Sequence, residues 1–484
     1  MRDDRRCCPV KHFPLTVYPE ISKLMLCLCG EVSDMNSLSA ENIVEIDDDA
    51  DEPDEKLSVE HGNRPIFSDT VTAQVSGLHD KFKRGKLIVQ PDFQRDFVWD
   101  KKRASKLIES SLLRIPIPII YISEEADSKQ YVIDGQQRLT SFFSFIDGKF
   151  PDASEFKLAG LEVLKPLNGK SYADLPESTQ DKIRDFGLTT VTFKKESDEN
   201  LKFEIFERLN TGSVPLNDQE LRNCIYRGPY NNLVHELSEH EDFRYILNLS
   251  GPDRRRKDVE FVLRFSAFFH ATYLKYKPPM KRFLNSEAIT RRQISAEDAE
   301  KLRGAFKNAC QMARSVFGKN AFKRFYRGDE QNTSGHWEPK KFNASLYDVI
   351  MYTFATSDKN TVIRHADQIR EGLIEVMTSN REFIDSIELS TSSLQAVKKR
   401  FDIWRRVFDA IVQPGAREPR IFSREIKERL FNENPTCEIC SQKIHDVDDA
   451  AVDHKLQFAA GGPTALENAR LTPRYCNWAR PRTE

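Results

Sequence analysis

Residues 437–477 read CEICSQKIHDVDDAAVDHKLQFAAGGPTALENARLTPRYCN, and this stretch decides the fold at the C-terminal end of the chain. It begins with a Cys-x-x-Cys pair, Cys437 and Cys440, and a third cysteine follows at Cys476. Cysteines at this spacing are typical of zinc knuckles, in which the metal holds together a segment too small to bury a core of its own. We therefore expect a structural zinc rather than a catalytic one.

The residues between these cysteines carry a second set of functional groups. His454 is suited to act as a general base, and Asp453 and Asn477 offer the oxygen ligands that Mg²⁺ or Mn²⁺ prefers. A Gly-Gly-Pro turn at 461–463 would let a short hairpin bring these groups together, and Asn468 would hold the loop. A base beside a hard cation is what hydrolysis of a phosphodiester requires. The predicted catalytic residues are His454, Asp453, Asn468 and Asn477.

This arrangement resembles the HNH (ββα-metal) endonucleases over roughly residues 430–482, because the Asp-His pair and both Asn residues occur in the family's order. The resemblance implies that His454 is the general base and that Asp453 and Asn477 bind the catalytic metal. It also implies that Asn468 orders the loop.

The zinc site departs from the family pattern at one position. Pro473 stands three residues before Cys476, where a Cys or His usually provides the fourth ligand. Three alternatives stay open: His445 replaces the missing ligand, water completes a three-coordinate site, or the knuckle is vestigial while the ββα core survives. Zinc at the three cysteines is expected under the first two alternatives only.

A second informative stretch joins a predicted strand to a predicted helix and consists of Asp134, Gly135, Gln136, Gln137 and Arg138. Alternating apolar residues predict strands around 117–122 and 130–133, and the apolar run 139–146 predicts a short buried helix. A glycine turn at a helix N-terminus directs backbone N–H groups toward an anion, and Arg138 would add a planar donor for phosphate. Alone, such a turn also fits a purely structural helix cap.

Two further motifs flank this loop in the sequence. Gln94 and Arg95 precede it, at the end of the run QPDFQR. Residues 203–209 predict an amphipathic helix that carries Arg208 and ends in an Asn-Thr-Gly turn beginning at Asn210. Asn217 is expected to be the N-cap of the next helix.

Together these motifs resemble the N-terminal domain of GmrSD-type restriction proteins, which is similar to the ParB/sulfiredoxin fold, over roughly residues 66–300. The resemblance implies binding and hydrolysis of an NTP, coupled to DNA cleavage in bacterial antiphage defence. The residues it assigns to the nucleotide are Gln94, Arg95, Asp134, Gly135, Gln136, Gln137, Arg138, Arg208 and Asn210.

The length of 484 residues and the hydrophobic share of 39% predict several ordinary cores. We expect an α+β multidomain protein. The predicted parts are a disordered or mis-started arm at 1–60, with Met35 as the alternative start, a ParB/sulfiredoxin-like α/β domain at 61–255, a helical domain at 256–411, a linker at 412–424 and an HNH domain at 425–484.

The net charge of −2 indicates that any nucleic-acid surface is local. Basic residues cluster between 398 and 429, where phosphate contact and a solvated face of ion pairs are both open interpretations. The chain lacks a long apolar run, a secretory signal and a disulfide-like cysteine spacing, so we expect a cytoplasmic protein without a membrane partner.

Together these observations favour an NTP-regulated, divalent-metal-dependent DNA endonuclease of the type IV restriction or antiphage type, acting on modified or foreign DNA. Two alternatives stay open. One is a ParB-like DNA-binding or scaffold protein whose HNH segment is a non-catalytic, zinc-stapled clamp, and the other is a toxin-like nuclease. The identity of the nucleotide and the formation of a homo-oligomer are left open.

Overall fold

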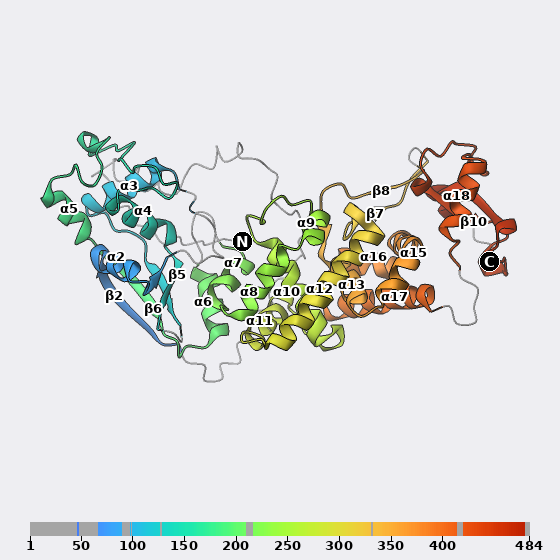
Figure 1. Cartoon of the computed structure of the whole chain (residues 1–484), viewed down its shortest axis with the longest axis horizontal. Coiled ribbons are helices and arrows are strands. Elements are labelled where there is room, and N and C mark those ends of the chain that lie inside the picture. The colour runs from blue at the N-terminus through green and yellow to red at the C-terminus, as the bar shows by residue number, and fades with distance from the viewer. Residues whose placement is uncertain are drawn as a thin grey trace, which may run out of the picture.

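The computed structural model describes residues 46–47, 66–89, 97, 99–125, 128–209, 216–330, 333–413 and 420–479. The chain extends along one axis, with a sheet-containing part at one end, helices in the middle and a small ββα unit at the other end (Figure 1). The predicted α+β fold class is therefore confirmed. The predicted N-terminal arm lies outside the described residues, apart from the short strand β1 (Ile46–Asp47).

The N-terminal part is built on a mixed five-stranded sheet with the strand order β2-β6-β4-β5-β3. Its strands are β2 (Ser68–Gln74), β3 (Leu87–Ile88), β4 (Ile120–Glu124), β5 (Gln130–Asp134) and β6 (Gly187–Phe193). Strand β4 runs antiparallel to β5 and parallel to β6. The strands predicted around 117–122 and 130–133 are therefore present as β4 and β5.

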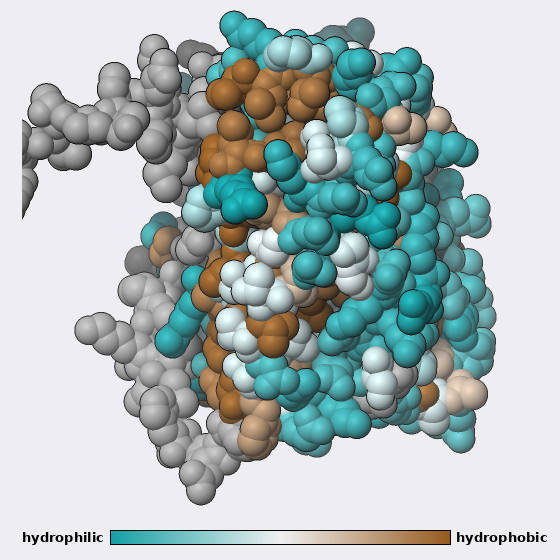
Figure 2. Space-filling view, turned by 90° about the vertical axis from the view of Figure 1, so that its left-hand side faces the viewer, coloured by the Kyte–Doolittle hydropathy of each residue, from teal (hydrophilic) through white to brown (hydrophobic). Residues whose placement is uncertain are grey.

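Among the residues that the structure describes, four α-helices accompany this sheet: α2 (Val75–Lys83), α3 (Lys101–Leu112), α4 (Gln136–Ile146) and α5 (Glu177–Arg184). The predicted apolar helix lies inside α4, where Leu139, Phe142 and Phe145 are fully buried. Their spacing of three residues places them on one face of the helix. The outer end of this part mixes hydrophobic and hydrophilic surface (Figure 2). Val71 of β2 is an exposed apolar side chain of the sheet.

The middle of the chain is helical, as predicted. Its helices are α6 (Glu199–Leu209), α7 (Asp218–Ile225), α8 (Pro229–Ser238), α9 (Glu241–Leu247), α10 (Lys257–Ala271), α11 (Met280–Thr290), α12 (Ala296–Phe317), α13 (Ala344–Ala355), α14 (Lys359–Arg364), α15 (Ala366–Ser379), α16 (Arg381–Glu388) and α17 (Leu394–Val412). Within the ranges that the structure describes, no helix combines the length and the apolar character that a membrane crossing needs.

One continuous core joins these helices, from Phe203 in α6 to Phe408 in α17. The predicted domain boundary at 255 falls inside this core, so packing does not mark a division there. Asn217 caps α7 as predicted, because its side chain accepts a hydrogen bond from the Glu220 amide (2.8 Å) and the Glu220 carboxylate accepts one from the Asn217 amide (2.7 Å).

A short hairpin projects from the helical part toward the C-terminal end of the chain (Figure 1). It consists of β7 (Phe325–Tyr326) and β8 (His336–Trp337), which pair antiparallel. A further strand, β9 (Phe342–Asn343), pairs with β1. Gly335 has a φ of +73°, and a Cβ there would lie 2.6 Å from the Tyr326 carbonyl oxygen, so the turn requires glycine.

The C-terminal part contains α18 (Arg424–Glu433), β10 (Ala450–His454), β11 (Ala469–Pro473) and α19 (Arg474–Ala479). Strands β10 and β11 pair antiparallel, with Asp453 opposite Arg470. The order β10-β11-α19 is the predicted ββα arrangement. Its buried core is small and consists of Ile444, Ala450 and Leu471, with Leu430 and Phe431 packed against it.

The C-terminal part docks on α15 and on the β7–β8 hairpin. Glu371 of α15 accepts hydrogen bonds from Arg474 of α19 and from Lys427 of α18, at 2.9 and 3.2 Å. The Tyr475 amide donates to the Thr333 carbonyl (2.7 Å), which ties α19 to the hairpin. These contacts fix the direction in which the ββα unit faces.

The basic residues between 398 and 429 are largely buried or bound to carboxylates. Arg400 is fully buried and donates to Asp348 (3.1 Å). The other pairs in this run are Lys399–Glu382, Arg420–Glu375, Arg424–Glu428, Lys427–Glu371 and Arg429–Glu433. Lys398, Arg405 and Arg406 are exposed and have no carboxylate within ion-pair distance among the described residues. The ion-pair interpretation therefore holds for the paired residues, and phosphate contact is excluded for Arg400 because solvent does not reach it.

Candidate active site

The Asp-His pair lies at the end of β10, where both side chains are more than nine-tenths buried. The opposing residue on β11, Arg470, donates two hydrogen bonds to Asp453 Oδ2, from Nε (2.8 Å) and Nη2 (2.6 Å). This cross-strand pair compensates the burial of the carboxylate and fixes its orientation.

Aromatic rings enclose the imidazole of His454. Its ring centroid lies 4.3 Å from that of Phe422 and 5.5 Å from that of Phe458. The Nε2 atom lies 3.0 Å from the hydroxyl of Thr464, which can donate or accept according to the tautomer. The side chain is therefore held in one orientation, which a general base requires.

Asn468 uses its side-chain amide to bridge the loop between the two strands. It accepts from the Leu456 amide (2.7 Å) and donates to the carbonyls of Leu456 (3.0 Å) and Pro463 (2.8 Å). The predicted loop-ordering role requires such bonds. The side chain does not line the cavity described next, so any effect of Asn468 on chemistry acts through the loop.

Asp453, His454 and Asn477 line one cavity of about 810 Å³. The structure thus brings together the predicted base and both predicted ligands of the catalytic metal. The opposite wall comes from α15 of the helical part, through residues that include Asp367, Glu371, Glu375, Thr378 and Ser379. The cavity is large enough for a nucleotide-sized group.

Glu371 supplies a partly buried negative charge on the α15 side of the cavity. Burial raises its pKa, but Arg474 and Lys427 outweigh this effect and bring its pKa down to about 2. The carboxylate is therefore ionised in the docked state. Sequence reasoning missed Glu371, because no local pattern on α15 marks a residue whose partner is 103 positions away.

The three cysteines come together beside this unit. The sulfur atoms of Cys437, Cys440 and Cys476 all lie within 4.8 Å of one another. Cys437 Sγ accepts from the amides of Ile439 (3.3 Å) and Cys440 (3.4 Å), which fixes the turn of the Cys-x-x-Cys pair. Burial raises the pKa of Cys476 to about 12, so a metal would have to displace its proton.

The fourth zinc ligand is not found in the part of the chain that the structure describes. The group that could hold a metal contains the three cysteines and no His, Asp or Glu. His445 is exposed and does not join it, so the proposed substitution of the missing ligand by His445 is wrong. A three-coordinate site completed by water and a vestigial knuckle both remain.

The loop at residues 134–138, which leads into α4, requires glycine at position 135. Gly135 has a φ of +98°, and a Cβ there would lie 2.3 Å from Ile120 Cδ1. Arg138 donates to the Pro118 carbonyl (2.5 Å) and to Asp134 Oδ2 (2.9 Å). The predicted phosphate donor is therefore bound within the protein, where it holds Asp134 beside the start of α4.

Of the other residues predicted for the nucleotide, Gln136 and Gln137 lie beside Gly135 at the start of α4, and Arg208 lies on a separate helix, α6. Arg208 is exposed on the last turn of α6. Gln137 accepts from the Trp99 amide (3.3 Å), and Gln136 is buried at the first turn of α4. Gln94, Arg95 and Asn210 lie outside the described residues.

Comparison with known protein families supports the domains predicted at the two ends of the chain. Residues 75–227 match the family model of the GmrSD restriction endonuclease N-terminal domain. Residues 437–480 match the family model of the HNH endonucleases. The search of curated proteins gave no match. The chain therefore joins a GmrSD-type N-terminal domain to a C-terminal HNH endonuclease domain.

Proposed function

We propose that this restriction-type nuclease is a divalent-metal-dependent DNA endonuclease in which His454 is the base. The observation that carries the proposal is the shared cavity of Asp453, His454 and Asn477. The carboxylate and amide oxygens of Asp453 and Asn477 form a donor set that fits Mg²⁺ or Mn²⁺. Such a metal, when bound, supplies charge stabilisation at the leaving oxygen.

The protein's own residues would prepare the attack. His454 would take a proton from the attacking water while Phe422 and Phe458 hold its ring. Arg470 would keep the Asp453 carboxylate oriented toward the metal, as outer-shell partners of metal ligands do. Loss of any one of these groups should impair cleavage more than DNA binding.

We also propose that the N-terminal domain binds and hydrolyses an NTP and thereby regulates cleavage of modified or phage DNA. The match of residues 75–227 to the GmrSD N-terminal domain and the left-handed glycine before α4 support this proposal. The nucleotide residues remain those predicted from the sequence. Arg138 would act by holding Asp134, because its guanidinium already bonds to that carboxylate.

The test is cleavage of matched plasmids, unmodified and phage-type modified, in Mg²⁺ or Mn²⁺, with and without each NTP. His454→Ala should abolish cutting and retain DNA binding. Asp134→Ala should abolish NTP hydrolysis. Hydrolysis at the parental rate by that variant would show that the loop is only structural.

The non-catalytic clamp remains the second candidate. The absence of a fourth ligand beside the cysteines of the described chain favours it, since a weakened knuckle is compatible with a vestigial nuclease. DNA binding by the parent without any cutting that depends on His454 would establish the clamp. Toxicity on expression that disappears in the His454→Ala variant would instead support the toxin-like alternative.

A further inference from the structure

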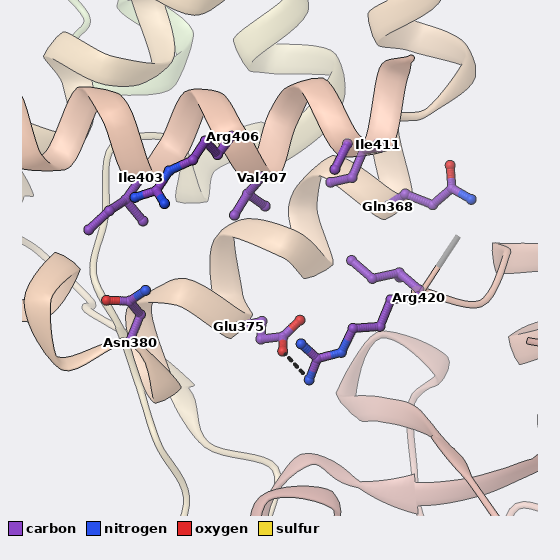
Figure 3. Close-up of a pocket in the computed structure, with 10 residues that line it drawn as sticks. Gln368, Glu375, Asn380, Ile403, Arg406, Val407, Ile411 and Arg420 are labelled. Atoms are coloured by element: carbon purple, nitrogen blue, oxygen red, sulfur yellow. Dashed lines mark ion pairs between the residues drawn. The ribbon is translucent and has the colours of Figure 1, made fainter. Parts of the chain in front are cut away.

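The cavity that holds the predicted catalytic residues has charged groups on both of its walls. Its carboxylates are all bound to cations in the described structure. The pairs are Asp367 with Arg370 and Arg424, Glu371 with Arg474 and Lys427, Glu375 with Arg420, and Asp453 with Arg470. Figure 3 is a close-up of a second pocket, lined by residues of α15 and α17, and it shows the ion pair of Arg420 with Glu375, two residues that line both pockets. These acidic groups therefore present little unpaired negative charge to a phosphate.

Arg327 differs from the other cations of this cavity. Lys427, Arg474 and Arg420 each bind a carboxylate, whereas Arg327 has no carboxylate within ion-pair distance among the described residues. Its side chain is exposed, and its guanidinium lies 5.8 Å from the ring centroid of Trp478. A cation that is held by a ring and not neutralised by a carboxylate remains available to an anion.

The β7–β8 hairpin fixes the position of Arg327. Phe325, two residues earlier, is buried and packs its ring against Trp337 at 5.1 Å and Trp478 at 6.3 Å between centroids. The Arg474 guanidinium lies 5.5 Å from the Phe325 ring on the other side of the interface. The hairpin is thus tied to α19, the helix that carries Asn477 immediately before Trp478.

We propose that Arg327 binds a phosphate of the DNA backbone at the nuclease site, so that the helical part of the chain completes the active site. This inference rests on the proposed nuclease function and adds a substrate-binding residue to it. A guanidinium matches the geometry of a phosphate with two parallel donors. Arg327 lies outside both matched regions, 75–227 and 437–480, so the HNH segment alone does not supply this group.

The experiment compares Arg327→Ala and Arg327→Lys in the full-length chain. Arg327→Ala should lower kcat/KM for plasmid cleavage by about 10- to 100-fold, the usual effect of losing a charge-assisted hydrogen bond. Arg327→Lys should recover part of this loss, because it keeps the charge but not the planar fork. The matched control is Arg282→Ala, an exposed arginine of α11 outside the cavity, which should cut within about two-fold of the parent.

A binding measurement separates phosphate contact from a structural effect. In the His454→Ala background, which should not cut, the affinity for a labelled duplex is measured against salt concentration. Arg327→Ala should reduce the slope of log K against log salt by about 0.9, the value for one lost phosphate contact. The thermal midpoint should not change, because the side chain is exposed.

The two proposals fail in different ways. Cutting by Arg327→Ala at the parental rate with an unchanged salt slope would overturn the role of Arg327 and leave the nuclease standing. A parent that cuts no DNA in any condition would overturn the proposed nuclease, and the salt slope would then decide by itself whether Arg327 touches phosphate.

Discussion

Replacing Glu371 by glutamine should undock the C-terminal part from the helices. The pKa of this partly buried carboxyl is about 2 against an ordinary value of 4.5, which corresponds to about 3 kcal/mol in favour of the ionised form. Glutamine keeps the size but removes the charge and leaves Arg474 and Lys427, both 4% exposed, without their anion. We expect a loss of about 3 kcal/mol, which agrees with the usual cost of breaking a buried ion pair.

The assay is urea unfolding of the full chain, together with hydrogen exchange at the Tyr475 amide, which bonds to Thr333 across the interface. The control is Glu382→Gln. It removes an exposed ion pair with Lys399 (3.4 Å), so it should cost no more than about 1 kcal/mol. The assigned role of Glu371 would be refuted if both variants had the same free energy of unfolding and the Tyr475 amide exchanged at the parental rate.

The pH dependence gives an independent check on the same residue. Because folding lowers the pKa of Glu371, its stabilisation is complete above the ordinary value of 4.5 and is lost as the pH falls toward 2. The difference in stability between the parent and Glu371→Gln should therefore be largest near neutral pH and shrink below pH 4.5. A difference that grows on acidification would contradict the sign of this linkage.

Three further substitutions and one control, Gly169→Ala, test the loops and the cysteines. Asn468→Ala removes three hydrogen bonds between the sides of the β10–β11 loop, so it should cost about 2–3 kcal/mol in thermal unfolding and slow cleavage at least tenfold. Gly135→Ala should cost about 2 kcal/mol or more, because it adds a clash with Ile120 to the backbone strain, whereas Gly169→Ala, with a φ of +81° in open space, should cost about 1 kcal/mol. Cys440→Ser should lower the zinc content measured by metal analysis, and unchanged content would favour the vestigial knuckle.

Local patterns in the sequence were enough to predict the elements that carry the site. Alternation around β4 and β5, the capping pair at Asn217, and the order of motifs along β10, β11 and α19 each depend on neighbours within a few residues. That Asp453 and Asn477 line the same cavity could also be predicted, because the β10–β11 hairpin and the short helix α19 fix the distance between them. These features need no knowledge of the rest of the fold.

Partners that are distant in the sequence could not be predicted in this way. Arg138, the expected phosphate donor, donates instead to the Pro118 carbonyl. This bond depends on how the residues just before β4 lie relative to α4. The burial of Arg400 against Asp348 likewise depends on the packing of α17 on α13. An arginine in a sequence offers the same donors to a phosphate, a carbonyl or a carboxylate, and only the tertiary structure decides among them.

The small core of the ββα unit links its stability to its site. Three buried apolar residues, Ile444, Ala450 and Leu471, bury too little surface to hold such a unit folded without support. Support comes from the contacts of Glu371 with Arg474 and Lys427, and these residues line the same cavity as His454. Loss of these contacts would therefore destabilise the ββα unit and also separate the α15 wall of the cavity from His454. The stability of this unit and the integrity of the cavity depend on the same interface.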